Sequence, residues 1–164
     1  MELLSKIDKQ KIEDRKLKND KLEDLLAQKR KLWASNLAPI FKTISTNLTS
    51  NQAKDIIEAQ TSALSYRQEL LEEITSNLIK RNKLDNLLKG LVAEKMIFYS
   101  TGFGYKPSSV NEKKMLIDNA VSEWETAVKL YEIYIDFLRE TVKNLESFQY
   151  SVKNVIAFLE YIQK

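Results

Sequence analysis

The chain contains no cysteine and no histidine. Without cysteine there is no disulfide framework and no zinc–thiolate site. Without histidine the commonest general base and metal ligand are missing, together with every Ser-His or Cys-His nucleophile pair. Neighbouring carboxylates on a helix point in different directions and do not replace these groups. We therefore expect no metal site, no cofactor and no enzymatic activity.

Residues that break helices are also scarce. Three glycines and two prolines occur among 164 residues, against an average usage of roughly 7% and 5%, so the backbone has few places to turn and long helices are predicted. No apolar run of about 18 residues is present. The N-terminal segment MELLSKIDKQ is charged from its second residue, which is not typical of a signal peptide. We expect no membrane-spanning segment and a cytoplasmic location.

Residues 1–50 are predicted to form a charged helical arm and a linker. Ten basic and seven acidic side chains share the first 31 residues. An apolar row at helical spacing follows: Leu22, Leu26, Trp33, Leu37, Ile40 and Ile44. Pro39 should kink or end this helix near Leu37–Ala38, and the polar segment 43–52 favours a linker.

The remaining residues, 51–164, are predicted to form a core of two long helices. The first should start near Thr49 or Ser50 and run to about Tyr99. Its apolar row is Ile57, Leu64, Leu71, Ile74, Leu78, Leu88 and Val92, with Ile56, Ala63, Leu70 and Leu84 beside it. Gly90 marks either a close helix crossing or a weak point. The second helix should start at a capping box, Ser109-x-x-Glu112.

This second helix carries a seven-residue repeat. One row is Ile117, Trp124, Tyr131, Leu138, Leu145, Val152 and Leu159, and the other is Val121, Val128, Ile135, Val142, Gln149 and Ile156. Gln149, the only polar member, either fixes the register of a partner helix or lies near an exposed end. A strict heptad repeat predicts left-handed coiled-coil packing.

A third apolar row makes the stripe wider than one partner helix can cover: Ala120, Ala127, Tyr134, Phe148, Val155 and Ile162. Apolar surface that remains exposed on a thin rod favours subunit contacts. The sequence thus predicts an all-α fold, in which a long antiparallel helical hairpin of coiled-coil type and an N-terminal helix form a homo-oligomer.

The segment FYSTGFGYKPSSV, residues 98–110, joins the two long helices within a basic region. Residues 80–114 hold eight basic and three acidic side chains, a net charge of +5, whereas the whole chain carries +3. Four aromatic rings lie among them, and basic grooves with aromatic platforms are typical of single-stranded nucleic-acid binding. Alternatively, the rings belong to the core and pin the loop, and the lysines only keep the tip soluble.

Three stretches resemble the UvsY-like recombination mediators of T-even-type phages. They are Phe98-Tyr99-Ser100-Thr101-Gly102, then LYEIYIDF at 130–137, then VKNVIAFLEY at 152–161. The match covers roughly residues 90–161. Members of that family carry a Lys-x-Arg pair before the aromatic turn. Here Lys95 takes the second basic position and Ala93 the first, so Lys89 is expected to compensate.

The resemblance implies a ring-like homo-oligomer that binds single-stranded DNA. Such a protein helps a RecA-like recombinase to displace single-strand-binding protein. The expected DNA-contacting residues are Arg81, Lys89, Lys95, Phe98, Tyr99, Phe103, Tyr105, Lys106, Lys113 and Lys114. The alternative is a structural coiled-coil protein, such as a virion or scaffold component, without a role in nucleic-acid binding.

Overall fold

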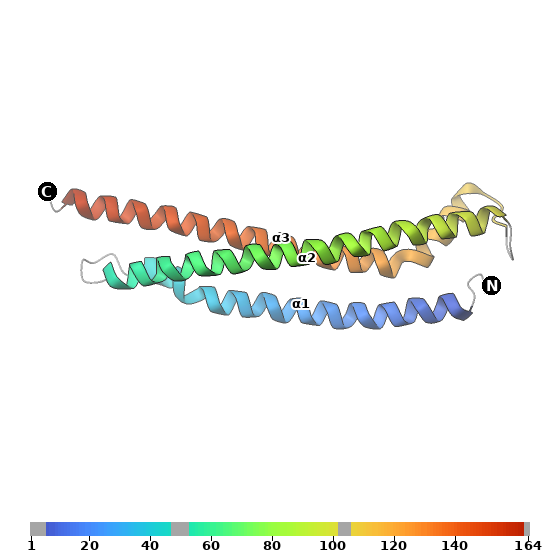
Figure 1. The fold of residues 1–164 in the computed structure, drawn as a ribbon, viewed down its shortest axis with the longest axis horizontal. Coiled ribbons are helices and arrows are strands. Elements are labelled where there is room, and N and C mark those ends of the chain that lie inside the picture. Colours follow the sequence, from blue (N-terminus) through green and yellow to red (C-terminus); the bar gives the residue numbers. More distant parts are fainter. Residues whose placement is uncertain (1–5, 47–52, 102–105, 163–164) are drawn as a thin grey trace. The chain divides into compact units, whose positions relative to one another are not determined.

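The computed structural model describes residues 6–46, 53–101 and 106–162. Its helices are α1 (Lys6–Thr46), α2 (Ala53–Thr101) and α3 (Val110–Ile162) (Figure 1). Only residues 106–109 are non-helical within these described ranges, and no strand occurs in them. The predicted all-α fold is therefore confirmed.

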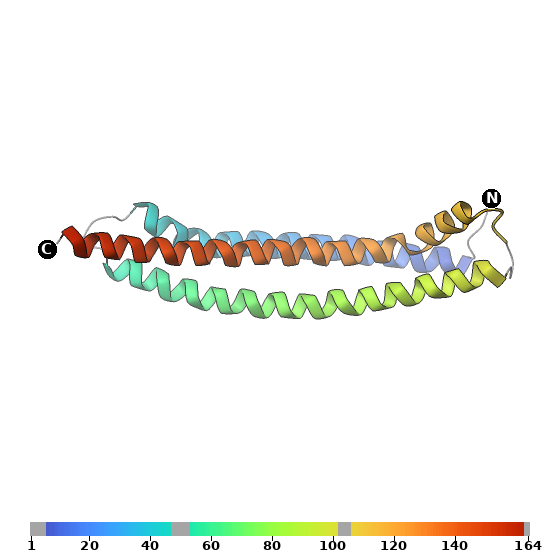
Figure 2. The same cartoon turned by 90° about the horizontal axis from the view of Figure 1, so that it is seen from above.

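Contacts divide the chain into two compact units, and each unit takes a part of every helix. Unit 1 contains Met1–Leu26 and Asn77–Ile133, and unit 2 contains Ala27–Ser76 and Tyr134–Lys164. In each unit, segments of α1, α2 and α3 lie side by side (Figure 2). These units combine distant parts of the sequence, whereas the predicted division at residue 50 separates consecutive parts.

Unit 2 has an apolar core to which all three helices contribute. Its buried apolar side chains are Leu37, Ile40, Ile56, Ala59, Ala63, Leu70, Ile74, Tyr134, Ile135, Leu138, Val142, Leu145, Phe148 and Val152. Two aromatic pairs at the edge of this core have edge-to-face geometry. The Trp33 and Tyr66 centroids are 6.1 Å apart, and those of Phe41 and Phe148 are 5.9 Å apart.

Unit 1 buries fewer apolar side chains and includes polar ones. The buried apolar residues are Leu26, Tyr99, Leu116, Ile117, Ala120, Val121, Ala127 and Val128. Asn19 and Asn77 are buried with them. Asn19 links α1 to α3, since its Nδ2 donates to the Glu123 backbone oxygen at 2.7 Å and to Glu123 Oε2 at 2.9 Å.

The three predicted rows of α3 form its inward face. Most of their described members are buried, while Trp124, Tyr131, Gln149 and Val155 are half-buried and Ile156 is exposed. The side chains of Leu159 and Ile162 lie outside the described part of the chain. Thr141, which interrupts the third row, is also buried and donates from Oγ1 to the Phe137 carbonyl at 2.8 Å. That bond allows a hydroxyl to occupy an apolar row.

Helix α1 does not end near Leu37–Ala38, so the alternative in which Pro39 ends the helix is wrong. The helix continues to Thr46, and its last turns bend away from the preceding ones (Figure 1). Leu37 and Ile40, on either side of Pro39, are both buried, so packing offsets a penalty of about 3 kcal/mol for an internal proline. Within the predicted linker, residues 43–46 are helical and 47–52 lie outside the described residues.

The predicted core row of α2 is wrong at Ile57 and Leu64 in unit 2, whereas its member Ile74 is buried and the predicted flanking row supplies other core residues. Ile57 is 60% exposed and Leu64 is 54% exposed, whereas Ile56, Ala63 and Leu70 are buried. The two rows are adjacent on the helix and equally apolar at these positions. Tertiary packing selects the row that contains Ala63, which allows a close approach between helices.

Candidate nucleic-acid interface

The candidate interface lies in unit 1, where α2 ends and α3 begins. The predicted cap of α3 is confirmed in part, because the Glu112 backbone N–H donates to Ser109 Oγ at 3.1 Å. The Glu112 carboxylate also bonds to the preceding serine. Its Oε2 accepts from the backbone N–H and the hydroxyl of Ser108, both at 2.6 Å. This arrangement fixes the direction in which the chain enters α3.

The aromatic pair at the end of α2 is divided between core and surface. Tyr99 is 3% exposed and packs with Leu116, Ile117 and Val92. Burial raises the pKa of its hydroxyl. Phe98 is 42% exposed, with its ring centroid 5.2 Å from that of Tyr99 in edge-to-face geometry. Phe98 therefore offers a ring to a ligand, whereas Tyr99 supports it from beneath.

Lys95, the basic residue that the resemblance places on the DNA, lies within a contact between α2 and α1. Its side chain is 13% exposed, and its Nζ lies 2.8 Å from Asp8 Oδ1. The same Nζ lies 5.8 Å from the centroid of the Phe98 ring. This cation therefore holds helices together and orients Phe98.

Two further predicted contact residues also pair with acids of unit 1. Arg81 bonds to Glu132 of α3, which raises the pKa of the Arg81 guanidinium. Lys89 lies 2.8 Å from Asp85 Oδ2 and lowers the pKa of that carboxyl. Much of the positive charge that the sequence places in residues 80–114 is thus locally balanced.

The remaining predicted contact residues surround the start of α3. Lys106 and Lys114 are exposed, and no ion pair involves them within the described residues. Lys113 donates from Nζ to Ser100 Oγ at 2.5 Å. Phe103 and Tyr105 lie outside the described residues. Lys80 and Lys83, which were not among the predicted contacts, are also exposed.

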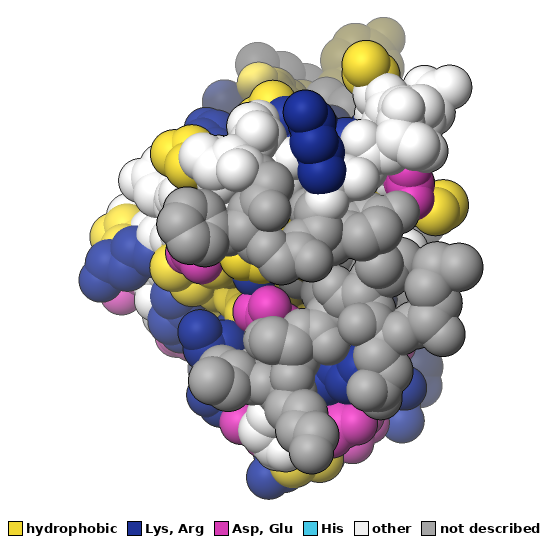
Figure 3. Space-filling model, turned by 90° about the vertical axis from the view of Figure 1, so that its right-hand side faces the viewer, with side chains coloured by type: hydrophobic (Ala, Val, Ile, Leu, Met, Phe, Trp, Pro, Cys, Tyr) yellow, Lys and Arg dark blue, Asp and Glu magenta, His cyan; other side chains and the backbone are white. Residues whose placement is uncertain are grey.

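A hollow of about 410 Å³ lies between the end of α2 and the start of α3. It is lined by Tyr99, Ser100, Lys106, Pro107, Ser108, Ser109, Val110 and Lys113. Two ammonium groups and three hydroxyls at its wall are donors suited to phosphate oxygens. Figure 3 looks onto this region and shows Lys and Arg together with Asp and Glu on the surface.

The polar contacts between α1 and the other helices were not foreseen. Asp8 and Lys95 are 87 positions apart in the sequence, and Asn19 and Glu123 are 104 apart. One feature of the sequence indicates the contact made by Asn19. Asn19 falls at helical spacing in the row of Leu22 and Leu26, which marks it as facing inward.

Comparison of the chain with protein-family models, with curated proteins and with solved structures finds no match. In the described parts of the three helices, no group of three or more acidic side chains is placed to hold a metal ion. None of the described helices combines the length and apolar character that crossing a membrane requires.

Proposed function

We propose that the chain is a single-stranded DNA-binding recombination mediator that acts as a homo-oligomer in the cytoplasm. In this role it helps a RecA-like recombinase to assemble on DNA covered by single-strand-binding protein, without catalysing a reaction. Recognition of the strand uses backbone charge and stacking, which do not depend on base sequence.

The observation that carries this proposal is the hollow at the start of α3. Lys106 and Lys113 line it beside three serine hydroxyls. The exposed ring of Phe98 contacts the ring of Tyr99, which lines the hollow, so a base stacked on Phe98 would lie near a phosphate in the hollow. Because the Ser108 hydroxyl donates to Glu112 and the Ser100 hydroxyl donates to the Met96 carbonyl, we assign the phosphate contact to the lysines and the Ser109 hydroxyl.

The DNA-contacting set is narrower than the one inferred from the sequence. We assign direct contact to Phe98, Lys106, Lys113 and Lys114. Tyr99, Lys95, Arg81 and Lys89 support this surface, because they are buried or paired. The supporting residues do not touch the DNA themselves, so we expect substitutions in the two groups to affect DNA binding in different ways.

We further propose that α2 and α3 form the predicted antiparallel hairpin. Within unit 1, Tyr99 packs against Leu116 and Ile117, and Arg81 bonds to Glu132. Thus an earlier position in α2 meets a later position in α3. In unit 2, Glu73 bonds to Tyr134 and Arg67 bonds to Glu146, which follows the same order.

A structural assembly protein is the second candidate. The pairing of Arg81, Lys89 and Lys95 with acids favours it, because these cations are less available to a polyanion. The exposed apolar side chains of unit 2, among them Ile57, Phe158 and Tyr161, favour it as well.

The deciding experiment measures the affinity of the chain for a labelled oligothymidine by fluorescence anisotropy over a salt series. A mediator should bind near physiological salt, with a slope of about 0.7 per phosphate contact. The triple variant Lys106→Ala, Lys113→Ala, Lys114→Ala should reduce both the affinity and the slope. Phe98→Ala should reduce the affinity by about 1–3 kcal/mol without changing the slope.

The matched control removes three exposed lysines of α1 in the same unit, by Lys16→Ala, Lys18→Ala and Lys21→Ala. It changes the net charge by the same amount and should leave most of the affinity intact. Equal losses in the two triple variants would assign binding to net charge alone and contradict this site. Absence of binding at any salt concentration would favour the structural role.

A further inference from the structure

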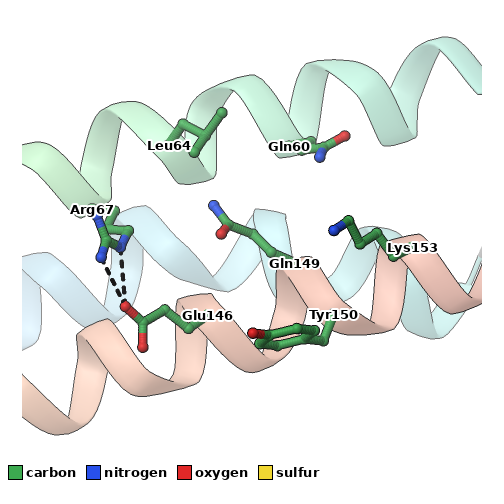
Figure 4. Close-up of a pocket in the computed structure, with 7 residues that line it drawn as sticks. All are labelled: Gln60, Leu64, Arg67, Glu146, Gln149, Tyr150 and Lys153. Carbon is green, nitrogen blue, oxygen red and sulfur yellow. Dashed lines mark hydrogen bonds and ion pairs between the residues drawn. The ribbon is translucent and has the colours of Figure 1, made fainter.

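A groove runs between α2 and α3 in unit 2. Its first hollow, of about 450 Å³, lies between Leu64 and Arg67 of α2 and Glu146 of α3 (Figure 4). A second hollow, of about 430 Å³, lies between Leu71 and Ile74 of α2 and residues 136–143 of α3. The lining positions on α2 follow one another at steps of three or four residues, so the groove matches the path of another helix. We call it the α2–α3 groove.

Charges alternate along the α3 wall of this groove. Asp136, Arg139, Glu140 and Lys143 line the second hollow. Arg139 lies 3.3 Å from Asp136, and Lys143 lies 3.4 Å from Glu140, but all four side chains are more than half exposed. Pairs exposed to this degree contribute little to stability and can exchange partners readily.

The first hollow holds hydrogen-bonding groups that are not used within the chain. The buried Gln149 Nε2 has no hydrogen-bond partner, although burying an amide donor without one costs about 1–3 kcal/mol. Glu146 accepts both Arg67 bonds on Oε1. Figure 4 shows Gln149 and Lys153 extending from α3 toward α2.

We propose that a second copy of this chain occupies the α2–α3 groove, with its α3 antiparallel to the first α3. The two-fold axis passes between residues 144 and 145. This interface deepens the oligomer of the proposed function and rests on it.

In this register two pairs of opposite charges meet across the interface, and each pair occurs twice. Residues equally far from the axis on the two chains face each other. Asp136 faces Lys153 of the second copy, and Lys143 faces Glu146 of the second copy. Because Glu146 uses Oε1 for Arg67, its Oε2 is left for that lysine.

The same register places a cation beside an aromatic ring. Arg139 faces Tyr150 of the second copy, whose ring is 69% exposed and suits a cation–π contact. Leu64, half exposed at the groove, is covered by the incoming helix.

The pattern selects a copy of this chain over an unrelated helix. The α3 wall is complementary to its own reversed sequence at three pairs of positions, and a two-fold axis uses each pair twice. A parallel partner in register would instead place like charges together. Opposite charges across the interface set its orientation and register.

The test is a charge swap measured by sedimentation equilibrium on the full chain. Lys153→Asp should raise the dimer dissociation constant at least about tenfold, because two like-charge contacts replace two attractive ones. Asp136→Lys should do the same. The double variant Asp136→Lys, Lys153→Asp should return the constant to near the wild-type value, since each pair is restored with reversed sign.

Lys129→Asp is the matched control, because Lys129 is an exposed lysine of α3 in unit 1. It should leave the dissociation constant unchanged. Far-UV circular dichroism of each variant verifies that the helices are intact. The chain has no cysteine, so mixing Arg139→Cys with Tyr150→Cys should give a disulfide-linked pair that neither variant gives alone.

Any of three results would contradict the interface. The wild-type chain could stay monomeric, the Lys153→Asp variant could associate like the wild type, or the double variant could fail to restore the dissociation constant. DNA anisotropy on the same wild-type sample decides the proposed function separately. A two-fold dimer that binds no oligothymidine contradicts the mediator role and leaves the interface standing. If the wild type binds oligothymidine but the charge swap leaves the dimer dissociation constant unchanged, the interface is contradicted and the mediator role stands.

Discussion

The two units bury α2 to different extents. In unit 2, α2 contributes five buried apolar residues to the core: Ile56, Ala59, Ala63, Leu70 and Ile74. In unit 1, Asn77 and Tyr99 are the only described residues of α2 that are buried. The same helix is therefore held mainly by apolar packing in one unit and by fewer apolar contacts in the other.

Polar contacts between helices occur in both units, and in unit 1 they accompany fewer buried apolar residues. Lys95 pairs with Asp8 of α1, and Arg81 bonds to Glu132 of α3. Unlike apolar burial, such contacts depend on the position of single atoms, and their net contribution is about 0.5–1.5 kcal/mol for a hydrogen bond. This comparison shows that the apolar core of unit 2 and the candidate interface of unit 1 are formed by different parts of the sequence.

The largest effect should follow from a cavity in unit 2. Leu145 is fully buried, so Leu145→Ala should lower the free energy of unfolding by about 2–5 kcal/mol. Leu87→Ala, at a half-exposed position of α2 in unit 1, should change it by no more than about 0.5 kcal/mol. Urea unfolding followed by circular dichroism measures both. Equal losses would remove the contrast between the units.

The core position of Leu145 was predictable, because a heptad repeat is a local property of one segment. Leu138 and Val152, each about two turns away in the same row, are likewise buried. The row of α2 was not predictable in the same way. Residues 56 and 57 are adjacent and both are isoleucine. Only packing against the other helices decides which of the two is buried.

A smaller loss should follow from removing a polar contact of unit 1. Asn19→Ala takes away the donor to Glu123 and the acceptor of the Arg15 Nε bond. The buried groups left behind should cost about 1–3 kcal/mol. Asp20→Ala, at the neighbouring exposed position, is the control for the change in helix propensity. A loss for Asn19→Ala that does not exceed that of the control would show that the bonds contribute nothing net.

The candidate interface was less predictable than the core. The Ser109–Glu112 cap follows from spacing along one segment, and it forms with the Glu112 side chain moved to Ser108. Lys95 was expected to be accessible, but its partner Asp8 lies 87 positions away. Charge counted along a segment cannot reveal which cations are neutralised by another helix.

High pH should also distinguish the units. Burial, together with the nearby Glu73 carboxylate, raises the pKa of Tyr134 in unit 2 from 10.0 to about 12. Between these values the unfolded chain has lost the tyrosine proton and the folded chain retains it, so the stability due to Tyr134 falls as the pH rises. Below pH 10 it is fully present.

Tyr134→Phe should therefore flatten the decline in stability between pH 10 and pH 12. Urea midpoints of both proteins at several pH values in that window measure it. Tyr150→Phe, at an exposed position, is the control and should leave the decline unchanged. Parallel curves for the wild type and Tyr134→Phe would show that the burial of this hydroxyl is not what makes the fold sensitive to base.

The smallest effect is a gain in stability in the sparsely packed part of α2 in unit 1. Gly90 is exposed within the helix, and a methyl group added there meets no atom within 4 Å, so it marks no close helix crossing. Gly90→Ala should therefore raise the free energy of unfolding by about 0.5–1 kcal/mol, because alanine loses less backbone entropy in a helix. Ser76→Ala, at a half-buried position of α2 in unit 2, changes helix propensity less and is the comparison. Thermal unfolding measures both variants. A destabilised Gly90→Ala protein would mean that this position needs the freedom of glycine for a contact that the folded chain makes with a partner.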